Sequence, residues 1–166
     1  MSWSSDLKSA SGLTLIELLV TLAILSILAA AALPYAELTV RRDKELELRR
    51  SLREVRSAID GFHDDWIAGR ITHGEDIASA DGYPRKLQVL IQGADTGRAG
   101  GGKRRYLRRL LRDPFAATAT DALADQWIIR GYQDEPDALI WNGKDVYDIH
   151  SASPAQAIDG TNYRDW

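Results

Sequence analysis

The chain opens with an apolar stretch long enough to span a bilayer. Residues 15–33 are 19 positions with a single charge, that of Glu17. A helix of this length would measure roughly 28 Å, close to the thickness of the hydrocarbon core of a membrane. The pattern favours a membrane anchor over two alternatives, a buried helix of a soluble protein and a secretory signal peptide cleaved near Ala30-Ala31-Ala32. Against the signal peptide, a single lysine precedes the run and Glu17 interrupts it.

A second apolar periodicity follows in residues 48–66. Its apolar side chains recur every three or four positions: Leu48, Leu52, Val55, Ile59, Phe62 and Trp66. This spacing predicts an amphipathic helix with one apolar stripe, which we expect to pack on the C-terminal part of the same chain. A coiled-coil seam remains the alternative, because the spacing also fits heptads for somewhat under three repeats.

The remainder of the chain predicts short elements. Frequent glycines indicate irregular structure in residues 69–104, with a turn at 81–84 and a short helix at 87–91. Residues 127–132, 138–141 and 146–150 are rich in β-branched and aromatic residues and predict strands, and Asn142-Gly143 predicts a hairpin turn between the last two. The expected fold is α+β: a long N-terminal helix, half transmembrane and half amphipathic, packed on a small C-terminal antiparallel sheet.

The composition excludes several kinds of functional site. The chain has 166 residues, enough for one modest domain and an N-terminal appendage, and no cysteine, which excludes disulfides, thiolate metal sites and cysteine nucleophiles. Residues 97–104 approach a P-loop, but Arg104 stands where the motif needs Ser or Thr. We predict that the chain is not an enzyme. Four titratable residues of the amphipathic helix are interpreted as a solvated face rather than a metal site: Asp60, His63, Asp64 and Asp65.

The most specific motif is Ser11-Gly12-Leu13-Thr14-Leu15-Ile16-Glu17, directly before the apolar run. An ionisable group at membrane depth costs about 2.5 kcal/mol or more, so Glu17 is a candidate functional residue. The order Gly, apolar, Thr, Leu, Ile, Glu resembles the type III signal of type IV pilins and type II secretion pseudopilins. The resemblance implies that residues 1–12 are a leader, and that a prepilin peptidase cleaves between Gly12 and Leu13 and methylates the new Leu13 amine. Pro34 stands where this family commonly has a proline.

The resemblance also implies a domain layout and a location. Residues 13–35 would form a hydrophobic helix, transmembrane before assembly and then the filament core, and residues 36–166 a periplasmic pilin-like globular domain. The chain would cross the inner membrane once, with its leader in the cytoplasm and its apolar helix in lipid. Counting charges alone favours the opposite orientation, because Arg41, Arg42 and Lys44 follow the run and Lys8 precedes it.

Four segments beyond residue 80 resemble the major, G-type pseudopilin of type II secretion. They are Gly82-Tyr83-Pro84 with the following helix, Tyr106-Leu107 through Asp113-Pro114-Phe115, Tyr147-Asp148-Ile149-His150-Ser151, and the tail 158–166. The resemblance implies the repeating subunit of a periplasmic pseudopilus that drives protein export through the outer membrane. The implied partners are other copies of the chain, minor pseudopilins, the prepilin peptidase and the inner-membrane secretion platform.

The resemblance implies two kinds of site: an ion pair between subunits at Glu17 and a calcium site that involves two aspartates. In this family the carboxylate corresponding to Glu17 is implied to pair with the Leu13 amine of a neighbouring subunit; a protonated carboxyl that tolerates the bilayer is the alternative. G-type pseudopilins bind calcium after the strand ending in Tyr-Ser. Here only Asp159 and Asp165 offer carboxylates, and two acids with main-chain carbonyls would make a weak calcium site.

Segment 98–112 is basic and contains no acid. Its cationic residues are Arg98, Lys103, Arg104, Arg105, Arg108, Arg109 and Arg112. We interpret it as a solvated surface that pairs with an acidic neighbour in the filament. The alternative is a type IV pilin or minor pseudopilin that binds DNA phosphates. Nucleic acid is the less favoured partner, because only Tyr106 could stack on bases and the net charge is −3.

Overall fold

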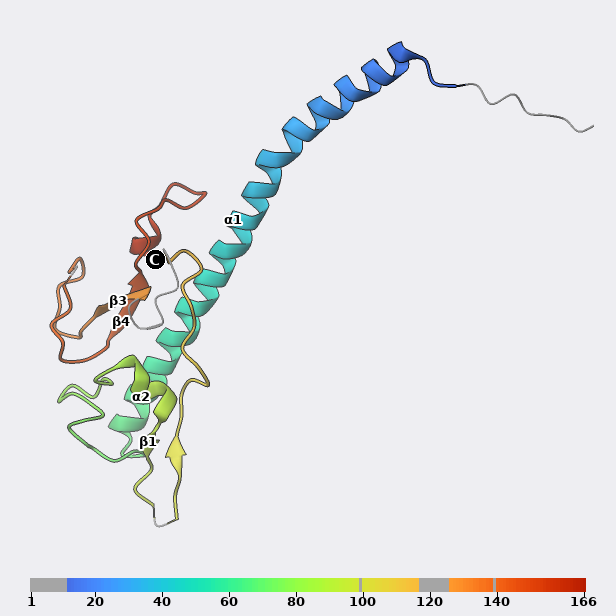
Figure 1. The fold of residues 1–166 in the computed structure, drawn as a ribbon. Helices are drawn as coiled ribbons and strands as arrows, with labels where there is room; N and C mark the ends of the chain where they lie inside the picture. The colour runs from blue at the N-terminus through green and yellow to red at the C-terminus, as the bar shows by residue number, and fades with distance from the viewer. Residues whose placement is uncertain (1–11, 99, 117–125, 139) are drawn as a thin grey trace, which may run out of the picture. The chain divides into compact units, whose positions relative to one another are not determined.

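The computed structural model describes residues 12–98, 100–116, 126–138 and 140–166 (Figure 1). The chain divides into two compact units, Met1–Val40 and Arg41–Trp166. Helix α1 (Leu15–Ile67) belongs to both, and Pro34 lies inside it. The remaining elements all belong to the second unit: α2 (Leu87–Gln92), β1 (Ala94–Asp95), β2 (Lys103–Arg104), β3 (Trp127–Arg130), β4 (Asp148–Ser151) and the 3-10 helix η2 (Tyr163–Asp165). The α+β prediction is confirmed.

The core of the second unit forms on the predicted stripe of α1. Leu48, Val55, Ile59 and Phe62 are completely buried and Leu52 is almost so. They pack with residues from α2, from both small sheets and from the C-terminal tail in one hydrophobic cluster. The stripe is therefore buried within its own unit rather than left free as a coiled-coil seam.

The chain after α1 folds back as the glycines and turn signals predict. Gly82 adopts a φ of +84°, and a Cβ at this position would lie 2.5 Å from Cε3 of Trp66. Only glycine fits both the backbone and the space. Tyr83 is thereby held against His63, whose ring stacks on it at 4.1 Å. The predicted short helix follows as α2, which buries Leu87 and Leu90.

The sheets are smaller than predicted, and one predicted strand is wrong. β1 pairs antiparallel with β2, and β3 with β4, the latter with Trp127 opposite Ser151 and Arg130 opposite Asp148. The described residues of 138–141 lie in no strand, so the Asn142-Gly143 hairpin does not form. Carboxylates organise this connection instead.

The hydrogen bonds of the β3–β4 connection show why no ladder forms there. Asp134 Oδ2 accepts from the Gly131 amide at 2.7 Å, and Asp145 Oδ1 accepts from the Tyr132 amide at 2.8 Å. Asn142 Oδ1 accepts from the Lys144 amide at 2.8 Å, a local turn that needs no strand pairing. Backbone donors bonded to side-chain oxygens are unavailable to a neighbouring strand.

Candidate functional site

The N-terminal site begins with a helix cap. The Glu17 amide donates to Thr14 Oγ1 at 3.3 Å, and the Leu18 amide donates to the Thr14 carbonyl at 3.1 Å. Thr14 is thus the N-cap, and Thr-Leu-Ile-Glu has the spacing of a capping box, which starts α1 at Leu15. Glu17 falls in the first helical turn, where the helix dipole favours a negative charge.

Exposed and mostly apolar side chains flank Glu17 in residues 13–33. Every residue of 12–40 whose burial is described is exposed, including Leu13, Ile16 and Leu25 at 69, 66 and 59 %. The described residues contain one helix, α1, that is long and apolar enough to cross a membrane, judged by length and composition alone. An apolar surface of this extent needs lipid or protein to cover it.

Polar groups within this apolar stretch are satisfied, apart from one. Thr21 Oγ1 donates to the Leu18 carbonyl at 2.9 Å and Ser26 Oγ to the Leu22 carbonyl at 2.7 Å. The Glu17 carboxylate has no hydrogen-bond or ion-pair partner among the residues that the structure describes. Burying an isolated charge is costly, so a charged Glu17 at membrane depth needs a partner from outside the described chain.

Comparison with known proteins gives a match at this site. Residues 7–33 match the prokaryotic N-terminal methylation motif. The chain carries a prepilin-type signal. A motif of this kind supports a pilin or pseudopilin class, and it implies processing by a prepilin peptidase and assembly into filaments. No curated protein and no solved structure matches the chain.

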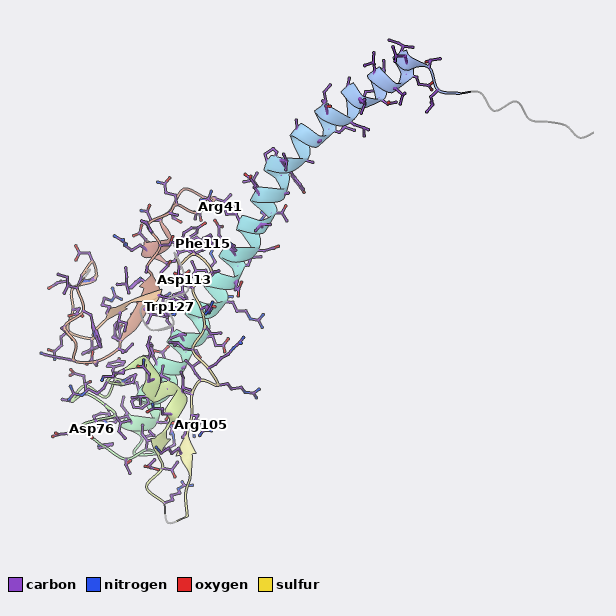
Figure 2. The ribbon with its side chains drawn as sticks, in the orientation of Figure 1. Arg41, Asp76, Arg105, Asp113, Phe115 and Trp127 are labelled. Atoms are coloured by element: carbon purple, nitrogen blue, oxygen red, sulfur yellow. The ribbon has the colours of Figure 1, made fainter. Side chains whose placement is uncertain are left out.

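The C-terminal segments singled out in the sequence meet in the second unit. Asp113, which is buried, accepts from Ser151 Oγ at 2.6 Å and thereby joins the Asp-Pro-Phe segment to β4. Phe115 stacks on Tyr163 at 4.0 Å, and Trp127 Nε1 donates to the Leu111 carbonyl at 3.1 Å. Figure 2 shows Asp113, Phe115 and Trp127 close together beside the middle of α1, below Arg41.

Glu45 anchors the C-terminal tail on α1. Its Oε1 accepts from the Ile158 amide at 2.7 Å and from the Tyr163 hydroxyl at 2.9 Å. Arg41 reaches the same hydroxyl at 3.2 Å and also donates to the Gln156 carbonyl. The tail is therefore fixed to the first two turns of α1 in the second unit.

Asp148 is the centre of a charged cluster on β4. Its Oδ1 lies 2.7 Å from Arg56 Nε, and its Oδ2 lies 2.9 Å from Arg130 Nη2 and 3.3 Å from His150 Nε2. Burial acts to raise the pKa of Asp148, but hydrogen bonds from His150 and Arg56 and the charge of Arg56 outweigh it and lower the pKa to about 2. The cluster joins α1, β3 and β4.

Asp65 corrects the interpretation of the helix end as a solvated face. Its side chain is 1 % exposed and forms ion pairs with Arg70 and Arg104, while Tyr106 Oη donates to Oδ2 at 2.8 Å. Burial acts to raise the pKa of Asp65, and the bonds from Arg70 and Tyr106 with the charge of Arg104 lower it below its ordinary value. The exposed faces of Asp60 and Asp64 do agree with the prediction.

The calcium prediction remains a prediction. Asp159 Oδ1 accepts from both the amide and the hydroxyl of Thr161, and Oδ2 lies 3.4 Å from Arg49. Asp165 Oδ2 accepts from Asn162 Nδ2 at 3.0 Å. In the described ranges, no group of three or more His, Asp or Glu side chains is placed to hold a metal ion. Any calcium site here would rely on main-chain oxygens for most of its ligands.

The basic segment 98–112 separates into two parts. Arg104 is exposed but forms an ion pair with the buried Asp65, so it contributes to the fold. Arg108 and Arg109 are exposed and line an open groove along α1.

Sequence analysis did not identify Thr14, Glu45 and Asp113 as residues that stabilise the fold. Only Thr14 carried a local signal, because its spacing to Glu17 is that of a capping box.

Proposed function

We propose that the chain is the repeating, G-type subunit of a type II secretion pseudopilus, which polymerises in the periplasm and drives protein export through the outer membrane. The observation that carries the proposal is Glu17: its carboxylate, in the first turn of an exposed apolar helix, has no partner among the residues that the structure describes. It lies within the matched methylation motif. Such a charge is stabilised when a cation reaches it, and assembly would supply one.

Processing would create that cation. Cleavage between Gly12 and Leu13 releases residues 1–12 and leaves a positive amine on Leu13. Gly12 is exposed, and apart from its chain neighbours no atom of the described residues lies within 4 Å of the position a Cβ would take, so a peptidase can approach the backbone. The proposed cut lies outside the capping box, so Thr14 still caps α1 and Glu17 keeps its place in the first turn.

Assembly then has an electrostatic and an apolar part. An unpaired charge at membrane depth costs about 2.5–3.5 kcal/mol, and pairing with the Leu13 amine of the neighbouring copy removes most of this cost. The pair would also set the axial stagger between copies. Helix-to-helix packing of residues 13–35 contributes the rest, and small residues such as Ala29 and Ala32 permit close approach. Pro34, which removes one hydrogen bond from α1, gives the helix local freedom to adapt to its neighbours.

The C-terminal unit favours a pseudopilin over a type IV pilin. The segments that resemble G-type pseudopilins bond to one another, through Asp113 with Ser151 and Phe115 with Tyr163. The tail is held by Glu45 rather than by the disulfide that closes many type IV pilins, and the chain has no cysteine to form one. We therefore propose residues 36–166 as the periplasmic domain, on a chain anchored in the inner membrane before assembly.

The test is the substitution Glu17→Ala in the chain expressed in its native envelope. We expect the variant to enter the membrane normally, yet to form at least tenfold fewer filaments and to block export, because the intersubunit pair is lost. Glu37→Ala is the matched control, since Glu37 is an exposed glutamate further along the same helix. Filaments formed by Glu17→Ala at the wild-type level would refute the pairing mechanism.

The proposal that the chain is the major subunit has its own test, the composition of purified filaments. A major subunit should outnumber every other chain with a methylation motif.

A further inference from the structure

An open groove of about 760 Å³ runs along the C-terminal part of α1, away from the buried stripe. One wall is helical, formed by Leu46, Glu47, Arg50 and Glu54. The other wall is formed by Arg108, Arg109 and Leu111 from the chain after β2. Leu46 is 58 % exposed, so the groove has an apolar patch that the fold leaves uncovered.

The groove carries a surplus of positive charge. On α1, Arg50 lies three residues after Glu47 and four before Glu54, so this wall carries two negative charges and one positive charge. Arg108 and Arg109 add two charges, and neither has an ion pair or hydrogen bond with any residue in the described part of the chain. The groove therefore suits an acidic surface that also presents an apolar side chain.

The β3–β4 connection presents such a surface. We name Glu135, Asp137 and Ile140 the acidic knob; all three are exposed, and Ile140 is 86 % exposed. The knob has a fixed base, because Asp134 and Asp145 bond the backbone at Gly131 and Tyr132.

The knob and the groove cannot meet within one copy. In Figure 1 the connection between β3 and β4 lies at one edge of the second unit, and the chain after β2 runs along the opposite edge. A contact between two different surfaces of the same protein is heterologous, and its repetition generates an open helical polymer rather than a closed dimer.

We propose that the acidic knob of one copy docks into the basic groove of the next, with Glu135 and Asp137 facing Arg108 and Arg109, and Ile140 covering Leu46. This proposal rests on the proposed function, since it adds a second contact between copies to the pair at Glu17. It gives Arg108 and Arg109 a partner that is a second copy of this chain rather than a nucleic acid.

Cross-linking in the native envelope tests the contact, and because the chain has no cysteine of its own, only the introduced thiols can cross-link it. With a short thiol-to-thiol cross-linker, chains carrying both Arg109→Cys and Glu135→Cys should give a ladder of dimers, trimers and larger species. Chains carrying either cysteine alone should give none. Dimers from a single-cysteine chain would indicate a symmetric contact and overturn the proposal.

Charge reversal gives a second test. If these residues only stabilised the fold, reversing the charges on both surfaces together would not restore the multimer yield. Arg108→Glu with Arg109→Glu should lower the multimer yield at least about tenfold through like-charge repulsion, as should Glu135→Arg with Asp137→Arg. All four changes in one chain should restore it. As a control, Glu75→Arg with Asp76→Arg reverses another exposed acidic pair and should leave the yield unchanged.

Electron microscopy of overproduced filaments separates this proposal from the proposed function. Filaments that form without a cross-linked ladder, and that tolerate both reversals, would overturn the knob-and-groove contact and leave the filament function standing. The absence of filaments from the unmodified chain would overturn both.

Discussion

Replacing Asp148 with Asn removes the one carboxylate that Arg56, Arg130 and His150 share. The side chain is 15 % exposed, so water replaces the lost interactions only in part. A pKa lowered from 3.8 to about 2 corresponds to roughly 2 kcal/mol, at about 1.4 kcal/mol per pH unit. Leaving two guanidinium groups facing a neutral amide adds to the loss. We expect Asp148→Asn to lower the free energy of unfolding by about 2–3 kcal/mol at pH 7.

The lowered pKa of Asp148 also predicts how the free energy of unfolding changes with pH. A carboxylate with a lowered pKa in the folded state stabilises fully above its unfolded pKa, near 4, and this stabilisation is lost as the pH falls through the folded pKa, near 2. The wild-type chain should therefore lose about 2 kcal/mol between pH 4 and pH 2 from this residue. Asp148→Asn should not lose that contribution, so the difference between the two proteins should shrink towards pH 2.

The assay is urea unfolding of the full chain in detergent micelles, followed by tryptophan fluorescence at several pH values. Asp76→Asn is the matched control, because Asp76 is exposed and takes part in no described ion pair. We expect the control to follow the wild type at every pH. A stability difference for Asp148→Asn that is the same at pH 2 and pH 7, or absent at pH 7, would refute the conclusion that the ionised Asp148 carboxylate stabilises the fold.

Two further predictions concern packing. Phe62→Ala should cost about 3–5 kcal/mol in the same assay, because Phe62 is completely buried and meets Tyr106 edge to face at 5.4 Å; a loss below about 1 kcal/mol would contradict its place in the core. Gly82→Ala should cost more than Gly160→Ala. Both glycines have positive φ, but only at position 82 does a Cβ meet Trp66, and nothing lies within 4 Å of it at position 160. Equal costs would show that the close approach to Trp66 is relaxed without strain.

The helical parts of the fold could be predicted from the sequence because their signals are local. The stripe from Leu48 to Phe62 repeats at the helical period, and the apolar run around Leu25 is continuous. The stripe shows which face of the helix is apolar, and the continuous run shows a helix that is apolar on all sides, before any partner is known. The same reasoning placed Gly82 in a turn, although it could not show that Trp66 excludes a side chain there.

The sheet and the buried charges could not be predicted because they depend on residues far apart in the chain. Ile140 and Trp141 have strand propensity, but the next amide, that of Asn142, donates to Asp134 Oδ2 at 3.4 Å, and the described residues there form no ladder. Asp65 has charged neighbours on a helix and looks solvated, but it is buried and forms an ion pair with Arg104, which lies 39 positions later in the chain. At the N-terminal site the motif named Glu17 directly, because a single charge in an apolar run is a local signal.

The central claim is that processing at Gly12 prepares a filament subunit whose new amine pairs with Glu17. Intact-mass and N-terminal peptide analysis of the protein from its native envelope tests this most directly. The account predicts a mature chain that starts at Leu13 and carries a methylated amine. A start at Leu33 would identify a conventional signal peptide and a released periplasmic domain, and an intact Met1 would leave a simple anchored protein; either result would contradict the account.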